Sequence, residues 1–142
     1  MLKLVAILCL GFVAFTAKAD PCPNLNGSYV FFEGTGSQFT ERVVQNGCQD
    51  ISPTQQLIGL RNQIKLDGNE VGSLNHIYSA YIRDSNAIVM KLQTASLTSG
   101  QVYMTSVCSY SLDVNTNLVR HCQTLNAKSE VISDIVDSGR RI

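Results

Sequence analysis

The residues of this chain that can do chemistry are few: five cysteines, two histidines and a scattered set of carboxylates. Cys9 lies inside an apolar N-terminal run, and the other four cysteines follow it. An even number of cysteines in an exported chain predicts two disulfides, which can connect in three ways. Because no C-x-x-C motif is present to lower a thiol pKa, we expect these cysteines to be structural. The four are Cys22, Cys48, Cys108 and Cys122.

The two histidines, His76 and His121, fall on different predicted strands. His121 precedes Cys122, but adjacent residues of a strand point to opposite faces, which argues against a Cys-His pair. The chain also lacks H-E-x-x-H, G-x-S-x-G, a Walker loop, and G-x-G-x-x-G after a strand. We therefore predict that the protein is not an enzyme and needs no metal or cofactor.

The first nineteen residues have the pattern of a secretory signal peptide. A short basic start is followed by an apolar run from Leu4 to Thr16 and by the small-residue pattern Ala17-Lys18-Ala19. The run is too short to cross a bilayer, so we expect cleavage near Ala19 and no membrane insertion of the mature chain. The predicted product, residues 20–142, is a single exported domain in the periplasm or the medium.

The charge balance excludes one class of partner. Without residues 1–19 the chain carries 9 basic and 11 acidic side chains, a net charge of −2. Such a surface has no electrostatic reason to bind nucleic acid or anionic lipid.

Two strands and a turn are predicted from Val102 to Leu125. Apolar and polar residues alternate with period two, and the turn falls near Asn115-Thr116. Antiparallel pairing then brings Cys108 nearly opposite Cys122, at a distance that a disulfide can span. The register stays open, because a shift of one residue aligns the apolar face with a different set of partners.

A second stapled hairpin is predicted near the N-terminus, with strands at Gly27–Glu33 and Phe39–Gln45. Asn46-Gly47 is a strong signal for a two-residue turn, so Cys48 would open the next strand. Folding the first strand on the second places Cys22 near Cys48. This geometry favours the pairs Cys22–Cys48 and Cys108–Cys122, although the sequence alone leaves the connectivity open.

The middle and the tail extend the same pattern. A strand is expected at Leu57–Leu66, a hairpin turn at Asp67-Gly68, and strands at Asn75–Arg83 and Ala87–Leu97. The tail, Ser129–Ile142, fits a strand better than a short helix because four of six residues from Val131 are β-branched. The whole chain therefore reads as all-β, a single antiparallel meander of eight to ten strands that closes into a small barrel.

A barrel of this size either fills its interior with large side chains or lines a ligand cavity with them. The candidate lining for a small apolar ligand consists of aromatic and methionine residues on the predicted inner faces. They are Tyr29, Phe31, Met90, Met104 and Tyr110.

The stretch Leu25-Asn26-Gly27-Ser28-Tyr29 resembles the L-x-G-x-[W/Y] opening of calycin barrels, the lipocalins and avidins. Cys22 just before it is similarly placed in avidins. The resemblance implies a lipocalin-like or avidin-like barrel in which Gly27 and Tyr29 begin the first strand. It also implies that a basic residue packs over the aromatic, and Arg120 is the candidate here. The aromatic is Tyr29 where the family has a tryptophan.

Two functions follow as expectations. In the first, the exported barrel is a non-enzymatic module that binds a small apolar ligand in its interior or at its mouth. In the second, a surface or loop engages another protein, as an envelope factor does. Periplasmic inhibitors of lysozyme are similar in kind, being small exported β-barrels with disulfides that act through a surface loop.

Overall fold

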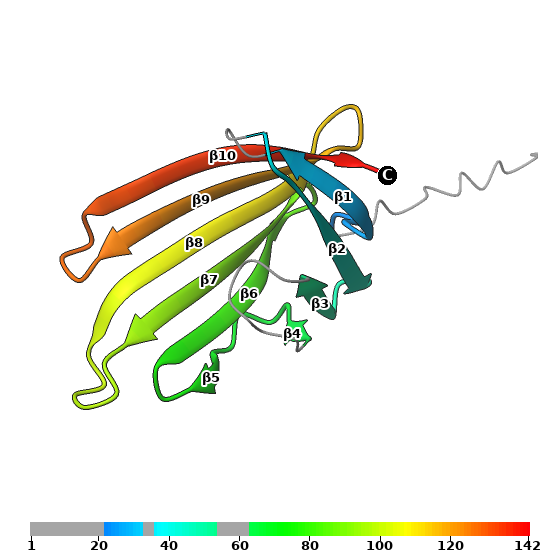
Figure 1. The fold of residues 1–142 in the computed structure, drawn as a ribbon. Helices are drawn as coiled ribbons and strands as arrows, with labels where there is room; N and C mark the ends of the chain where they lie inside the picture. Colours follow the sequence, from blue (N-terminus) through cyan, green and yellow to red (C-terminus); the bar gives the residue numbers. More distant parts are fainter. Residues whose placement is uncertain (1–21, 33–35, 54–62) are drawn as a thin grey trace, which may run out of the picture.

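In the computed structural model, ten β-strands among the described residues form one continuous antiparallel sheet that curves into a nearly closed barrel (Figure 1). The structure describes residues 22–32, 36–53 and 63–142, and within these ranges every element is a strand. The all-β prediction and the strand count are therefore confirmed. The strands are β1 (Gly27–Phe32), β2 (Gln38–Asn46), β3 (Asp50–Pro53), β4 (Ile64–Lys65), β5 (Val71–Ser73), β6 (His76–Asp84), β7 (Ala87–Ala95), β8 (Val102–Leu112), β9 (Leu118–Asn126) and β10 (Val131–Arg141).

The chain forms two meanders, β1 to β4 and β5 to β10, joined where β1 pairs with β10. The expected hairpin at Asp67-Gly68 is wrong, because β4 and β5 lie at opposite ends of the sheet order. Instead the Gly68 N–H donates to the Ala80 carbonyl at 2.8 Å, and Asp67 forms a bridge with Tyr81 on β6. These contacts between the segment after β4 and strand β6 bring the two ends of the sheet together.

Both favoured disulfides are present. Cys108 lies directly opposite Cys122 in the β8–β9 register, with 4.0 Å between the Cα atoms, which settles the register that the sequence left open. Cys22 is bonded to Cys48 with a Cα separation of 5.7 Å. Cys48 does not open β3 as expected: the Gln49 N–H donates to the Asn46 carbonyl, so Cys48 lies within the turn.

The interior is filled by side chains from the inner faces of most strands. Tyr29, Phe31 and Tyr110 are at most 2% exposed, and the rings of Phe31 and Phe39 stack with centroids 5.1 Å apart. Gly139 on β10 leaves room for this packing, because a Cβ there would lie 2.5 Å from the Phe31 ring. Other members of this core are Leu25, Val43, Ile51, Ile64, Tyr78, Ile88, Met90 and Leu118.

The tail is a strand, as predicted. β10 pairs with β9 from Val131 to Gly139, with a register shift between Val131 and Ser133, and with β1 only at Arg140 and Arg141. The predicted signal peptide and most of the predicted strand Leu57–Leu66 lie outside the described residues; of the latter, Ile64 and Lys65 form β4.

Candidate functional site

Four of the five predicted ligand-lining residues lie in the packed core. Tyr29, Phe31, Met90 and Tyr110 are at most 4% exposed, and Met104 near the start of β8 is half-buried. A side chain that borders an accessible cavity keeps some exposed surface. The first four therefore contribute to the core of the barrel, and their contact with a ligand stays a prediction.

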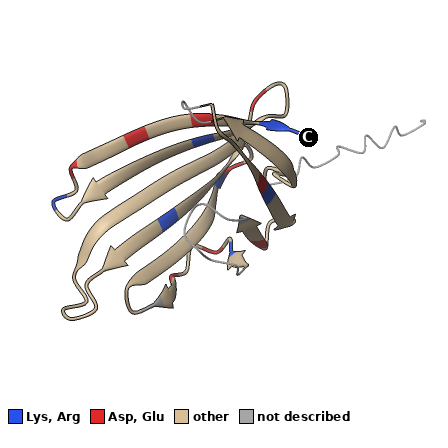
Figure 2. Cartoon of the chain, in the orientation of Figure 1, with Lys and Arg blue, Asp and Glu red and all other residues tan. Residues whose placement is uncertain are grey.

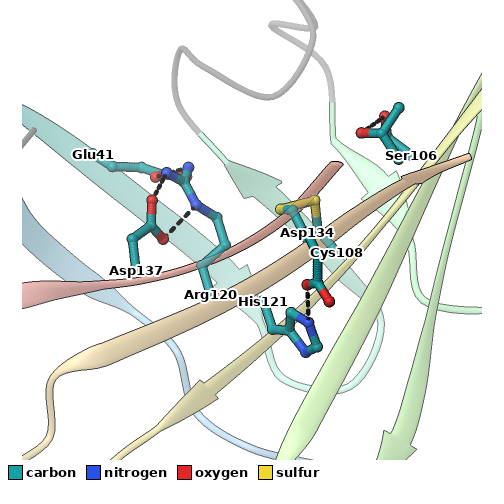
Figure 3. The surroundings of a disulfide bond; sticks show 9 residues. Glu41, Ser106, Cys108, Arg120, His121, Asp134 and Asp137 are labelled. Carbon is teal, nitrogen blue, oxygen red and sulfur yellow. Dashed lines mark hydrogen bonds and ion pairs between the residues drawn. A yellow bond between two sulfur atoms is a disulfide. The ribbon is translucent and has the colours of Figure 1, made fainter. Parts of the chain in front are cut away.

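A buried ionic cluster that was not predicted lies on the inner face near these residues (Figure 3). Arg120 on β9 donates from Nε to Asp137 Oδ1 on β10 at 2.9 Å, and a second, short bond joins Nη2 to Oδ2. Its Nη1 lies 3.5 Å from Glu41 Oε2 on β2. The guanidinium therefore joins three strands, in a fork geometry that suits a bidentate carboxylate pair.

Glu41 is the member of this cluster whose charged form is least favourable. Its side chain is 1% exposed, and its Oε1 has no hydrogen-bond partner among the described residues; the same is true of the Tyr110 hydroxyl. Burial raises the pKa of Glu41 to about 7, although the attraction of Arg120 opposes the shift. Burial also raises the pKa of Tyr110, so its hydroxyl stays protonated. The cluster is close to charge balance only when Glu41 is protonated.

Arg120 also packs on an aromatic ring, although not on the one that the calycin resemblance implied. Its guanidinium carbon lies 4.9 Å from the centroid of Phe31, a cation–π geometry. Tyr29 instead donates from its hydroxyl to the Leu25 carbonyl at 2.9 Å. The expected stacking on Tyr29 is therefore corrected to stacking on Phe31.

The next residue, His121, lies on the outer face of the sheet. Its Nε2 is 2.6 Å from Asp134 Oδ1, and Gln123 donates to Asp134 Oδ2 at 3.1 Å. His121 and Asp134 are about half exposed. Within the described ranges no group of three metal-ligating side chains is present, and no helix is long and apolar enough to cross a membrane.

One small cavity lies beside the Cys22–Cys48 disulfide. Its volume is about 150 Å³, and polar groups of its walls bond to one another. Gln45 accepts from the Leu25 N–H at 2.9 Å and donates to the carbonyls of Pro23 and Gly47. Because these polar groups already have hydrogen-bond partners within the protein, we interpret the cavity as structural.

Strand β10 has an open edge from Val131 to Ser138, and we call this stretch the β10 edge. On one side it pairs with β9; on the other, no described strand is paired with it. The Ile142 N–H donates to Ser28 on the β1 side, and backbone groups alternate in direction along an antiparallel strand. The N–H and C=O groups of Asp134, Val136 and Ser138 therefore point away from β9.

The β10 edge also exposes apolar side chains on both faces. Four β-branched side chains of this stretch are each more than half exposed: Val131 53%, Ile132 60%, Ile135 55% and Val136 67%. Unpaired backbone groups combined with exposed β-branched side chains form a template for an additional strand.

No protein-family model, curated protein or solved structure matches this chain. Function is therefore inferred from the geometry, and the calycin resemblance stays a prediction.

Sequence reasoning missed both the ionic cluster and the β10 edge. A signal for the first existed, since Glu41 shares a face of its strand with Phe39 and Val43. The second had a partial signal in the β-branched tail, but nothing in the sequence indicated that β1 would leave β10 after two pairs.

Proposed function

We propose that this protein is an exported binding module that engages another polypeptide by strand addition along the β10 edge. The observation that carries the proposal is the unpaired stretch Val131–Ser138, with four exposed β-branched side chains. In strand addition, main-chain hydrogen bonds supply affinity and the alternate side chains supply specificity.

The packing of the interior favours this function over the binding of a small apolar ligand. The expected lining is largely buried in the core, whereas large apolar surface is exposed at the edge. Exposed apolar surface beside unpaired backbone is costly for a monomer to keep, so its presence points to a partner.

The ionic contacts of β10 support strand addition along the side of the strand that faces away from β9. Asp137 and Asp134 are both turned toward β9, where Arg120 and His121 bind them. Charged side chains often protect an edge strand from pairing, but here both carboxylates bind side chains of β9, and Asp134 keeps about half of its surface exposed. The backbone of the β10 edge is left accessible.

Site-specific crosslinking in the protein's own host tests the proposal. A photoreactive phenylalanine analogue at Ile132, on the edge, is compared with one at Val114, which is 99% exposed in the β8–β9 turn. We expect a recurring crosslink to one polypeptide from position 132 and not from position 114.

A substitution at Val136 distinguishes strand addition from non-specific contact of apolar side chains. Val136→Pro removes an N–H that points away from β9, so it should abolish the crosslink, while Val136→Thr should retain it. Equal crosslinking from positions 132 and 114, or crosslinking that Val136→Pro leaves unchanged, would contradict the proposed function.

A further inference from the structure

The β10 edge carries two carboxylates and no basic residue between Val131 and Ser138 (Figure 2). Asp137 is neutralised by the guanidinium of Arg120, which lies on the inner face. Asp134, on the outer face, has His121 as its only ion-pair partner among the described residues. Hydrogen bonds from Gln123 and His121 lower the pKa of Asp134, so it is ionised at neutral pH. The outer face of the β10 edge therefore carries one negatively charged side chain, Asp134.

This charge argues against a second copy of the chain as the occupant. Two β10 edges related by a two-fold axis overlap most when the axis passes Asp134 or Ile135. The first register places Asp134 directly opposite its own copy, and the second places the two carboxylates diagonally, within about 8 Å. Like charges directly opposite each other destabilise a strand pair.

The same charge and the flanking apolar side chains define the occupant that fits. On the outer face Asp134 lies next to Val136, on the inner face Ile135 is exposed, and Ile132 falls within the register shift between Val131 and Ser133. We infer that the β10 edge binds an extended segment of a different protein, with β-branched or aromatic side chains at alternate positions and a lysine or arginine opposite Asp134. This inference rests on the proposed function and adds the chemistry of the partner.

A peptide series tests the inference directly. Three capped peptides share eight alternating valine and threonine residues: one has lysine at a central position, one has glutamate there, and one has proline. Binding is followed through the amide resonances of Asp134, Val136 and Ser138 in the oxidised protein at low ionic strength. We expect the lysine peptide to bind about five-fold more tightly than the glutamate peptide, and the proline peptide not to bind.

The variant Asp134→Asn is the matched control, since it keeps the size and hydrogen-bonding capacity of the side chain. It should bind both charged peptides and lose the preference between them. If no peptide moves the edge amides, the proposed function fails. If the lysine and glutamate peptides bind the original protein equally, only the inference about charge fails.

Sedimentation velocity tests the alternative occupant. The protein should be monomeric at tens of micromolar, and Asp134→Asn should increase any self-association because it removes the repulsion. A dimer of the unchanged protein that Val136→Pro dissociates would overturn the inference in favour of a second copy.

Discussion

The two ends of strand β10 have the same kind of backbone but opposite surroundings. At Gly139 the strand is buried against Phe31, and at Arg140 and Arg141 it pairs with β1 (Figure 1). From Val131 to Ser138 it has β9 alone as a described neighbour, and its apolar side chains are exposed. The departure of β1, rather than the composition of β10, therefore divides the strand into core and edge.

The two ionic pairs between β9 and β10 repeat this contrast at consecutive residues. Arg120 binds Asp137 on the inner face, with side chains 12% and 28% exposed. His121 binds Asp134 on the outer face, with side chains 44% and 52% exposed. Because water screens the outer pair and the inner pair is shared with buried Glu41, the two should differ widely in their effect on stability.

The largest expected effect is therefore the removal of the inner cation. Arg120→Leu leaves Glu41 and Asp137 without a counter-charge, and we expect unfolding in urea to show a loss of about 3 to 5 kcal/mol at pH 8. The loss should be smaller at pH 5, where Glu41 is protonated. His121→Ala is the control and should cost less than about 1 kcal/mol. Similar losses in both variants would remove the distinction between the two faces.

Glu41→Gln should have the next largest effect, with the opposite sign. The pKa of Glu41 is about 7 in the folded protein against an ordinary 4.5, so the folded state holds its proton more tightly. This group therefore favours folding below pH 4.5 and loses that contribution as the pH rises to about 7. The variant should be more stable than the original at pH 8, by at most about 3 kcal/mol, and should lack this decline.

Urea unfolding at a series of pH values measures the effect. Glu130→Gln, at an exposed carboxylate, is the matched control and should keep the decline. A Glu41→Gln profile that runs parallel to the original from pH 4.5 to 8 would show that Glu41 is not held in an unfavourable charged state.

A smaller effect is expected at the buried end of β10. Gly139→Ala places a Cβ 2.5 Å from a Phe31 ring that Arg120 and Phe39 enclose. Overpacking of this kind costs about 1 to 3 kcal/mol. Thermal unfolding of Ser138→Ala, one residue away and exposed, should be nearly unchanged; equal shifts in the two variants would mean that the position is not close-packed.

The smallest effect on stability is expected at the edge itself. Val136→Pro removes an N–H that has no partner strand, so it should cost no more than about 1 kcal/mol. Ile135→Pro removes an N–H that faces β9 and should cost several-fold more. If the two proline variants lose similar stability in urea, the assignment of backbone directions along β10 is wrong.

The fold could be predicted further than the site, for physical reasons. Alternation with period two reports which face of a strand is buried, and the spacing of Cys108 and Cys122 about a turn reports their pairing. The contacts between distant parts of the chain that close the barrel leave no such local signal. Glu41 is separated from Arg120 by 79 residues, and their contact exists only because β1 joins β2 to β10 and β9.

The edge could not be predicted for a related reason. Four β-branched residues after Ser129 indicated a strand, but a strand in the centre of a sheet and one at its edge can have the same composition. Only the register, in which β1 pairs with Arg140 and Arg141 and no further, exposes the rest of β10.

Amide hydrogen exchange, resolved by residue with NMR, tests the central claim most directly. If the β10 edge is open, the amides of Asp134, Val136 and Ser138 should exchange much faster than those of Ser133, Ile135 and Asp137, which face β9. Uniform protection of all six amides in the monomeric protein would contradict the account, because it would mean that another segment already covers this side of the strand.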